Sequence, residues 1–372
     1  MRAELKNKKR WVIKVGSSVL VDPEGSLKSL YFRALARQIA SLLESKKQVV
    51  LVSSGAVAAG LDLLALREKP KSLVTKQAIA AAGQSRLMQE YEKAFRPFQL
   101  KVGQMLLTHE DLGHRRRFLN ARHTLSELLR LGLIPIVNEN DTVTAEEIKV
   151  GDNDNLAALV AHLAEADLLI NLSDIDGVYE QDPSFFPQAK KLDLLKKISA
   201  FIKKGASDTL KQGSTGGMLT KLEAAEKAQA YGIPTIIANG KAPKILNKIE
   251  QGKSVGTLIL PKEQKMGSKK YWIAYGMKSR GCLEVDQGAK EVLLKKGRSL
   301  LPSGICGVIG SFQKGDAVDI CLKGGKTFAR GLTSYHSEEI KKLMGHQSSE
   351  ISKILGYKYL DVVVHRDDLV IF

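Results

Sequence analysis

Residues 213–221, Gly-Ser-Thr-Gly-Gly-Met-Leu-Thr-Lys, form a glycine-rich segment that ends in a lysine. The next residues, up to Tyr231, favour a helix, so that Lys221 would lie in the first turn of a predicted helix 217–231. Glycines let backbone N–H groups approach an anion closely, and a helix N-terminus adds about half a positive charge there. The segment is therefore typical of a phosphate-binding turn, although short glycine patterns also occur in ordinary loops.

Polar residues also stand at the ends of predicted strands. These segments are Lys14–Ser18, Ser53–Ala56, Asn138–Asp141 and Ser173–Asp174, and a further polar cluster is Lys149–Asn155. Because Gly, Ser, Asn and Asp are common in all loops, one such segment alone would indicate only a turn. The carboxyl ends of parallel strands meet at one edge of a sheet, so the segments together predict a ligand site at that edge.

The residue types favour phosphoryl transfer. Lys14 and Lys221 lie on separate elements beside glycines, and two ammonium groups suit a phosphoryl group whose charge spreads over its oxygens. The chain has no P-loop: Gly325-Lys326-Thr327 resembles the end of one, but Ile320 stands where the first glycine is required. A protein-kinase catalytic loop and a Ser-His-Asp or Cys-His arrangement are also absent from the sequence. An enzyme without an evident general base suits a nucleophile that is already ionised, such as a carboxylate.

The first two thirds of the chain alternate apolar strand-like runs with helical segments. The predicted strands are 11–15, 49–53, 102–107, 134–138, 168–172 and 235–238, followed by 255–260. The predicted helices are 30–43, 74–95, 117–131, 155–163 and 217–231. Since the strands are apolar along their whole length, the pattern predicts an α/β fold with a mainly parallel sheet sandwiched by helices. His162 falls in the apolar helix 155–163, where we expect a structural role.

The length and the change in pattern after residue 260 predict two domains. A chain of 372 residues exceeds what one hydrophobic core usually supports. A polar, lysine-rich stretch then precedes short strands punctuated by glycines, which are typical of a small β-rich domain. We therefore expect a first domain at 1–262, a linker at 263–278 and a second domain at 279–372.

Composition restricts the function further. The 57 Lys and Arg against 40 Asp and Glu give a net charge of +17, which favours anionic ligands. The excess is spread over both parts of the chain, and only 6–10 and 115–117 are dense basic runs. No apolar run reaches the roughly 18–20 residues of a membrane span, and the charged N-terminus lacks a signal peptide, so we expect a cytoplasmic protein. No His or Cys spacing indicates a metal site.

In order and spacing, the segments Val12–Ser18, Val52–Ala56, Val137–Asp141, Lys149–Asn155 and Thr215–Lys221 resemble the glutamate 5-kinase family over essentially the whole chain. That family joins an amino-acid-kinase domain to a C-terminal PUA domain, to which 281–372 is similar. The resemblance implies ATP-dependent phosphorylation of the γ-carboxylate of L-glutamate to L-glutamyl 5-phosphate, the first step of proline biosynthesis. It also implies ATP with Mg²⁺, the metal being held mainly by phosphates and water.

The resemblance assigns roles to individual residues. Lys14 and Lys221 would stabilise the transferring phosphoryl group, and Asp154 would hold both ammonium groups in place. The family's glutamate-binding positions correspond to Ser54, Asp141 and Asn153: Asp141 would pair with the α-ammonium, while Asn153 and the N–H groups at the helix start near Asp154 would hold the α-carboxylate. The implied ATP contacts are Lys14, Ser173, Asp174, Thr215, Gly216, Gly217, Met218, Leu219, Thr220 and Lys221.

Two other functions are weighed against this one. An N-acetylglutamate kinase would leave Asp141 facing a ligand that has no ammonium, and relatives of that kind lack the PUA-like part. An RNA-binding or RNA-modifying protein would suit the PUA-like part and the basic charge, but the first domain has no RNA-modification motif and aromatic residues are only 6% of the chain. RNA binding by the PUA-like part stays open. By resemblance we also expect proline as an inhibitor and a homo-oligomer, a dimer or tetramer.

Overall fold

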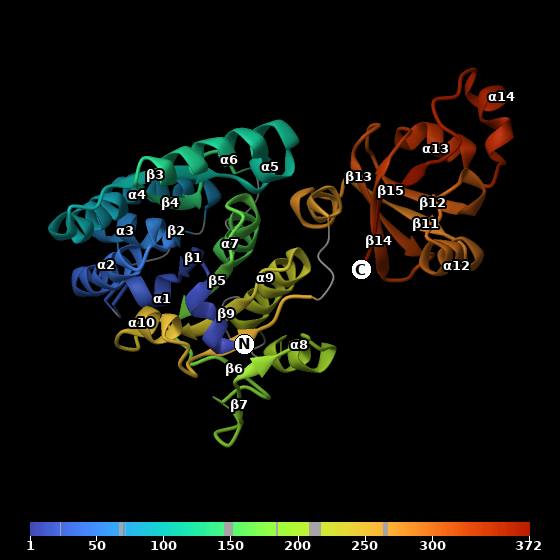
Figure 1. Cartoon of the computed structure of the whole chain (residues 1–372). Helices are drawn as coiled ribbons and strands as arrows, with labels where there is room; N and C mark the ends of the chain where they lie inside the picture. Colours follow the sequence, from blue (N-terminus) through green and yellow to red (C-terminus); the bar gives the residue numbers. More distant parts are fainter. Residues whose placement is uncertain are drawn as a thin grey trace. The chain divides into compact units, whose positions relative to one another are not determined.

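The computed structural model describes residues 1–22, 24–66, 70, 72–144, 152–183, 185–207, 217–262 and 267–372. It divides into two compact units, Met1–Lys265 and Met266–Phe372, which we describe separately (Figure 1). Residues 145–151 and 208–216, which include parts of the predicted ligand segments 149–155 and 213–221, lie outside the described residues.

Within its described residues, the first unit contains an eight-stranded sheet with the order β3-β4-β2-β1-β5-β9-β10-β8. The strands are β1 Arg10–Val15, β2 Gln48–Ser53, β3 Val102–Leu107, β4 Ile134–Glu139, β5 Leu168–Ser173, β8 Leu194–Leu195, β9 Thr235–Asn239 and β10 Thr257–Ile259. The pairs along β3-β4-β2-β1-β5-β9 are parallel, and β10 runs antiparallel to β9. The predicted mainly parallel sheet is confirmed. A separate ribbon pairs β6 Val178–Tyr179 with β7 Lys191–Leu192.

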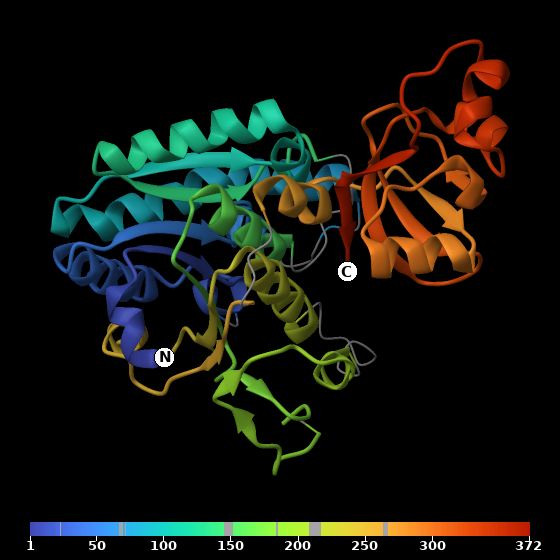
Figure 2. The same ribbon diagram turned by 45° about the vertical axis from the view of Figure 1, so that its right-hand side comes forward.

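Helices cover both faces of this sheet, as Figure 2 shows. On one face lie α6 Arg115–Arg130, α7 Asp152–Leu163 and α9 Gly217–Tyr231; on the other lie α2 Ser29–Glu44, α3 Ala56–Leu63, α4 Leu73–Phe95 and α10 Ile245–Glu250. Shorter helical segments are η1 Arg2–Asn7, α1 Ser17–Leu20, η2 Arg96–Phe98, α5 His109–Gly113 and α8 Ala200–Ser207. The five predicted helices are confirmed, whereas α3, α8 and α10 were not predicted.

Strand β1 shows how alternation along the chain positions a polar side chain. Trp11, Ile13 and Val15 belong to the buried apolar cluster that contains Phe32 of α2 and Tyr91 of α4. Because successive side chains of a strand point to opposite faces, Lys14 points to the other face, which α7 covers. A lysine that is only 5% exposed thus lies under the sheet-facing side of α7.

Helices α3 and α4 approach each other closely at two glycines. A Cβ atom at Gly83 would lie 1.9 Å from the carbonyl oxygen of Ala56, and one at Gly60 would lie 2.0 Å from that of Ile79. Any other residue would push the two backbones apart, so glycine is required at both positions. This contact holds the start of α3, which follows the end of β2, against the middle of α4.

The second unit is β-rich, as predicted. In its described residues a five-stranded sheet has the order β12-β11-β13-β14-β15. The strands are β11 Gly281–Val285, β12 Ile305–Gly310, β13 Ala317–Leu322, β14 Thr327–Thr333 and β15 Val364–Ile371. The helical segments are α11 Ser268–Tyr271, η4 Trp272–Gly276, α12 Gln287–Lys296, η5 Pro302–Gly304, α13 Ser337–Leu343, η6 Ser348–Glu350 and α14 Ile351–Leu355.

The segment that leads into this sheet is tied to it by one arginine. Arg330 of β14 donates to the carbonyl oxygens of Ala274 at 2.9 Å and Met277 at 3.0 Å, and its Nε pairs with Asp319 at 2.7 Å. Helical residues from the range 263–278 therefore pack on the second unit.

His162 on α7 lies between aromatic rings in the first unit. Its ring centroid is 3.8 Å from that of Tyr231 and 5.3 Å from that of Phe118, and the side chain is buried. Burial, together with the charge of Arg122, lowers the pKa of His162 from 6.5 to about 4. The packing is that of a structural residue.

The pKa of His162 makes the stability of the first unit depend on pH. Because the folded-state value is below the unfolded one, the contribution of neutral His162 is present above pH 6.5 and is lost as pH falls toward about 4. Between pH 7 and 5, His162 should lower the unfolding free energy of the wild type by about 2 kcal/mol. We expect His162→Leu to abolish this decrease. Urea unfolding measures this, followed by Trp11 fluorescence in a Trp272→Phe background. The exposed-site control His123→Gln should keep the wild-type slope, and an unchanged slope in His162→Leu would contradict the assignment.

Candidate active site

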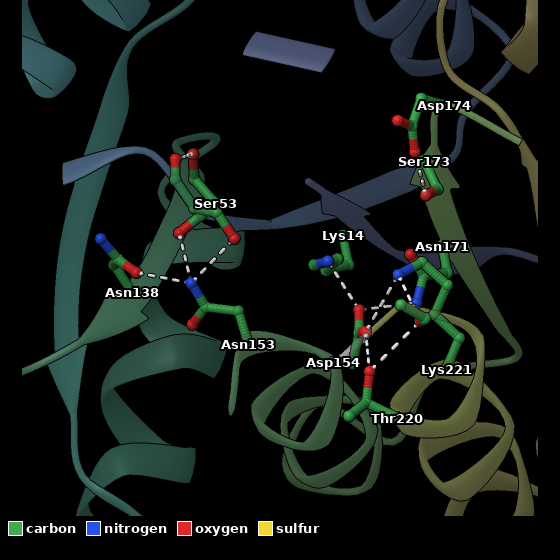
Figure 3. A network of polar contacts seen from close by, with 12 residues as sticks. Lys14, Ser53, Asn138, Asn153, Asp154, Asn171, Ser173, Asp174, Thr220 and Lys221 are labelled. Atoms are coloured by element: carbon green, nitrogen blue, oxygen red, sulfur yellow. Dashed lines mark hydrogen bonds and ion pairs between the residues drawn. The ribbon is translucent and has the colours of Figure 1, made fainter. Parts of the chain in front are cut away.

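Three buried charges meet where the carboxyl ends of β1 and β5 approach α7 and α9 (Figure 3). Asp154 Oδ1 lies 2.6 Å from Lys14 Nζ, and Asp154 Oδ2 lies 3.4 Å from Lys221 Nζ. The exposed fractions are 5% for Lys14, 1% for Asp154 and 8% for Lys221. The structure thus brings together the three residues predicted to handle the phosphoryl group.

Each of these side chains is positioned by a different element. Lys14 stands in register with Asn171 of the neighbouring strand β5, and Asn171 Nδ2 donates to Asp154 Oδ1 at 2.8 Å. In the first turn of α9, Thr220 Oγ1 donates to Asp154 Oδ2 at 2.9 Å, and Lys221 Nζ donates to the carbonyl oxygen of Gly217 at 2.9 Å. Asp154 therefore accepts from four donors on three elements.

The electrostatics of this cluster favour binding of an anion. Burial lowers the pKa of Lys14, and the charge of Asp154 opposes that change. Burial alone would raise the pKa of Asp154, but Lys14 and Lys221 hold it below its ordinary value, so the carboxylate is ionised at neutral pH. Two ammonium groups against one carboxylate leave a surplus positive charge in a site with little water, where charge interactions are strong.

A second, uncharged network lies at the ends of β2 and β4. The two hydrogens of Asn153 Nδ2 are shared by three acceptors, Ser54 Oγ at 3.0 Å, Asn138 Oδ1 at 3.1 Å and the carbonyl oxygen of Ser53 at 3.2 Å. Asn138 Nδ2 donates in turn to Gln84 Oε1 of α4 at 2.8 Å. Ser53 Oγ lies 2.8 Å from the hydroxyl of Tyr91, which connects this network to the core.

The two networks are joined by consecutive residues at the start of α7. Figure 3 shows Asn153 directed to the ends of β2 and β4, and Asp154 directed to Lys14 and Lys221. One helical turn therefore carries an amide to one network and a carboxylate to the other. A ligand that reached both networks would be bound by neutral hydrogen-bonding groups at one end and by the lysine ammonium groups at the other.

The other predicted site residues that the structure describes lie after β4, at the end of β5 and at the start of α9. Asp141 is half-buried in the turn after β4, and Ser173 Oγ donates to Asp174 Oδ1 at 3.1 Å at the end of β5. Met218 and Leu219 pack against the apolar cluster of Val178, Leu195 and Leu222, and Gly217 begins α9. Thr215 and Gly216 lie outside the described residues.

Sequence reasoning missed Asn171 and Gln84. Asn171 interrupts the apolar run Leu-Leu-Ile-Asn-Leu of β5, and a polar residue inside a fully buried strand was the signal that could have identified it. Gln84 has no such signal, because a glutamine within a long helix is most often exposed.

The described residues contain no group of three His, Cys, Asp or Glu side chains that could hold a metal ion. Among them, too, no helix is long and apolar enough to cross a membrane.

Comparison with known families identifies the class of this fold and site. Residues 9–239 match the amino acid kinase family, and residues 281–355 match the PUA domain. The match to the first family covers more than half of the chain and includes both networks, so the class is that of the amino acid kinases.

Curated relatives narrow this class. A glutamate 5-kinase of Pelobacter propionicus is 51% identical over 372 residues, and one of Geobacter sulfurreducens is 49% identical over 372, with 100% of both chains covered in each case. A glutamate 5-kinase of Caldanaerobacter subterraneus is 48% identical over 362 residues, 97% of each chain. The chain belongs to the glutamate 5-kinase family, as its motifs predict, and is an enzyme of the kinase type.

The buried charge cluster gives a test that is independent of activity. Asp154→Asn would leave two buried ammonium groups without a counter-ion, and we expect it to lower the unfolding free energy by about 3–5 kcal/mol. The triple variant Lys14→Met, Lys221→Met, Asp154→Leu removes all three charges and should recover at least half of that loss. Urea unfolding followed by Trp11 fluorescence in the Trp272→Phe background measures both. A triple variant no more stable than Asp154→Asn would show that the carboxylate does not act as the counter-ion.

Proposed function

We propose that this chain transfers the γ-phosphoryl group of ATP to the γ-carboxylate of L-glutamate, which forms L-glutamyl 5-phosphate in proline biosynthesis. The observation that carries the proposal is the pair of networks joined at Asn153 and Asp154. One network has the surplus positive charge that phosphoryl transfer requires. The other has neutral donors and acceptors suited to an amino acid, and the family relationship supports this pairing of substrates.

On the phosphoryl side, Lys14 and Lys221 would stabilise the charge that develops on the transferring group. Asp154 accepts from both ammonium groups, so their positions are fixed before substrate binds, and little reorganisation is required during transfer. The N–H groups at the start of α9 and the segment 213–217 would hold the ATP phosphates. Ser173 and Asp174 at the end of β5 complete the proposed ATP contacts.

On the acceptor side, no general base is required. The γ-carboxylate of glutamate is ionised near pH 7, so it attacks without losing a proton. Ser54, Asp141 and Asn153 would bind the α-amino-acid group, which leaves the γ-carboxylate directed to the lysine cluster. ATP supplies the phosphoryl group, and Mg²⁺ held by phosphates and water would neutralise part of its charge.

The decisive measurement is MgATP-dependent formation of acyl phosphate, trapped as hydroxamate, with L-glutamate, N-acetyl-L-glutamate or no acceptor. We expect product with L-glutamate alone. Lys14→Ala and Lys221→Ala should each lower kcat by about 10²–10³-fold, because each removes a donor to the developing charge. Asp154→Asn should lower kcat more than it changes KM.

The matched control for this measurement is Lys227→Ala, which removes a lysine from the same helix, α9, where Lys227 donates to Asn155 Oδ1 at 2.7 Å. It should keep turnover. Product with N-acetyl-L-glutamate instead would keep the phosphoryl-transfer site and overturn the substrate. In the same assay, proline should raise the KM for glutamate without changing kcat if it competes for the amino-acid network.

A hollow in the second unit favours RNA as an additional ligand. It has a volume of about 780 Å³ and is lined in part by Arg298, Ser299, His365 and Arg366. Arg366 N donates to Ser299 Oγ at 3.0 Å, which ties β15 to the loop after α12. The lining also includes Asp286 and apolar residues such as Leu301, so it is the part near Arg298, Ser299 and Arg366 that suits a phosphate backbone.

We expect the full-length chain to retard single-stranded RNA in a gel, with retardation that weakens as salt rises. Arg298→Glu with Arg366→Glu should abolish it. Lys341→Glu with Lys353→Glu is the charge-matched control on α13 and α14 and should retain it. Equal loss in both double variants would indicate non-specific attraction by net charge, and no retardation by the wild type would remove RNA from the proposal.

A further inference from the structure

We infer that Gln84 is a positioning residue: through Asn138 it sets the orientation of the Asn153 amide, so that Asn153 Oδ1 faces the ligand as an acceptor for the ammonium of an α-amino acid. The inference rests on the proposed function and specifies how its amino-acid network recognises substrate. It concerns the series of three side-chain amides that runs from α4 through the end of β4 to the start of α7.

The orientations of the Asn138 and Asn153 amides are each fixed by a partner that has only one polarity. An Asn amide can be turned over with little change of shape, so its oxygen and nitrogen are assigned from hydrogen bonds. The backbone N–H of Glu139 is a donor, and it lies 2.9 Å from Asn138 Oδ1. The carbonyl oxygen of Ser53 is an acceptor, and it lies 3.2 Å from Asn153 Nδ2. The two assignments agree, and the hydrogen bond from Asn153 Nδ2 to Asn138 Oδ1 couples them, so a change in the Asn138 amide is transmitted to Asn153.

Gln84 stabilises this orientation from the buried end of the series. Its Oε1 accepts from Asn138 Nδ2 at 2.8 Å, and the exposed fractions are 8% for Gln84 and 2% for Asn138. Without that acceptor, Asn138 Nδ2 would be a buried donor with nothing to bind. Turning the Asn138 amide over would then place its nitrogen, a donor, against two other donors, the N–H of Glu139 and the amide nitrogen of Asn153. The position of Gln84 depends on the glycine contact between α3 and α4, since it follows Gly83 directly.

The nitrogen and the oxygen of the Asn153 amide therefore have different roles. Asn153 Nδ2 already donates to Ser53, Ser54 and Asn138, while the buried Asn153 Oδ1 has no hydrogen-bond partner in the described part of the chain. A buried carbonyl oxygen of this kind is satisfied by a donor from a ligand, and an α-ammonium is the donor that an amino acid offers. A ligand carboxylate in place of the ammonium would set one acceptor against another, Asn153 Oδ1.

Ser54 complements this arrangement. Its Oγ accepts from Asn153 Nδ2, so the hydroxyl hydrogen remains as a donor. The network then offers an acceptor to the ammonium and a donor to the α-carboxylate of the same amino acid. This assigns to Asn153 the opposite contact from the α-carboxylate contact that the family resemblance suggests.

Discrimination between L-glutamate and glutarate, which lacks the ammonium, tests the inference. KM is measured for L-glutamate, and the inhibition constant against it is measured for glutarate, with MgATP saturating. Gln84→Met should raise the KM for glutamate about tenfold and leave the glutarate constant, the kcat and the KM for ATP nearly unchanged. Gln84→Glu keeps an acceptor for Asn138 Nδ2 and should restore most of the discrimination.

The matched control is Gln229→Met, which removes another buried glutamine amide from the same unit. Gln229 lies on α9 and donates to the carbonyl oxygens of Lys196 and Leu260, at 2.9 and 2.6 Å. Its loss should leave the ratio of the two constants unchanged, whatever it does to stability. An unchanged ratio in Gln84→Met, or an equal loss in Gln229→Met, would overturn the inference. A wild-type chain that turns over no glutamate would instead overturn the proposed function, and the ammonium assignment with it.

Discussion

The interaction on which the first unit depends is the contact of one carboxylate with two buried ammonium groups. Lys14 and Lys221 could not share a desolvated site without Asp154, because like charges repel strongly where little water screens them. The register between β1 and β5 sets Asn171 beside Lys14. Together with the packing of α9 on α7, it completes the contacts of that carboxylate. Much of the sheet order around β1 can be understood as the means of bringing these groups together.

The second network is held by a different constraint. It contains no described charge pair, so its specificity depends on the direction in which neutral amides point. Such direction is set only when each donor meets an acceptor and the series ends on groups of fixed polarity, here a backbone N–H and a backbone carbonyl. The two halves of the site thus use charge and hydrogen-bond polarity respectively, and α7 contributes one residue to each.

Much of this was predictable from the sequence, because the signals were local. The runs that became β1, β3 and β9 are mainly apolar, with few polar residues among them, and the amphipathic period of α2 and α6 is strong. Helix α3 was missed because Ala56–Leu63 is apolar almost throughout and contains Gly60, which lowers its helix propensity. The family motifs gave Lys14, Asp154 and Lys221 as a set, but the geometry that joins them required the structure.

What the sequence could not supply depends on contacts between distant segments. Asn171 acquires its function from pairing with β1, and Gln84 from the close approach of two helices at glycines. The orientation of Asn153 depends on a backbone group of a strand end that lies far away in the chain. None of these follows from residue type or spacing, since each requires the register or the packing to be known first.

The adjacency of Asn153 and Asp154 has a consequence for the size of the substrate. Consecutive Cα atoms are about 3.8 Å apart, and the Asn153 and Asp154 side chains are each held by several contacts, so the two networks keep a nearly constant separation. The first turn of α7 therefore limits the length of an amino acid that can reach both networks. An amino acid that is one methylene shorter, such as L-aspartate, could occupy the amide end and still leave its distal carboxylate short of the lysines. It should then bind as an inhibitor and accept no phosphoryl group, which the hydroxamate assay with aspartate would decide.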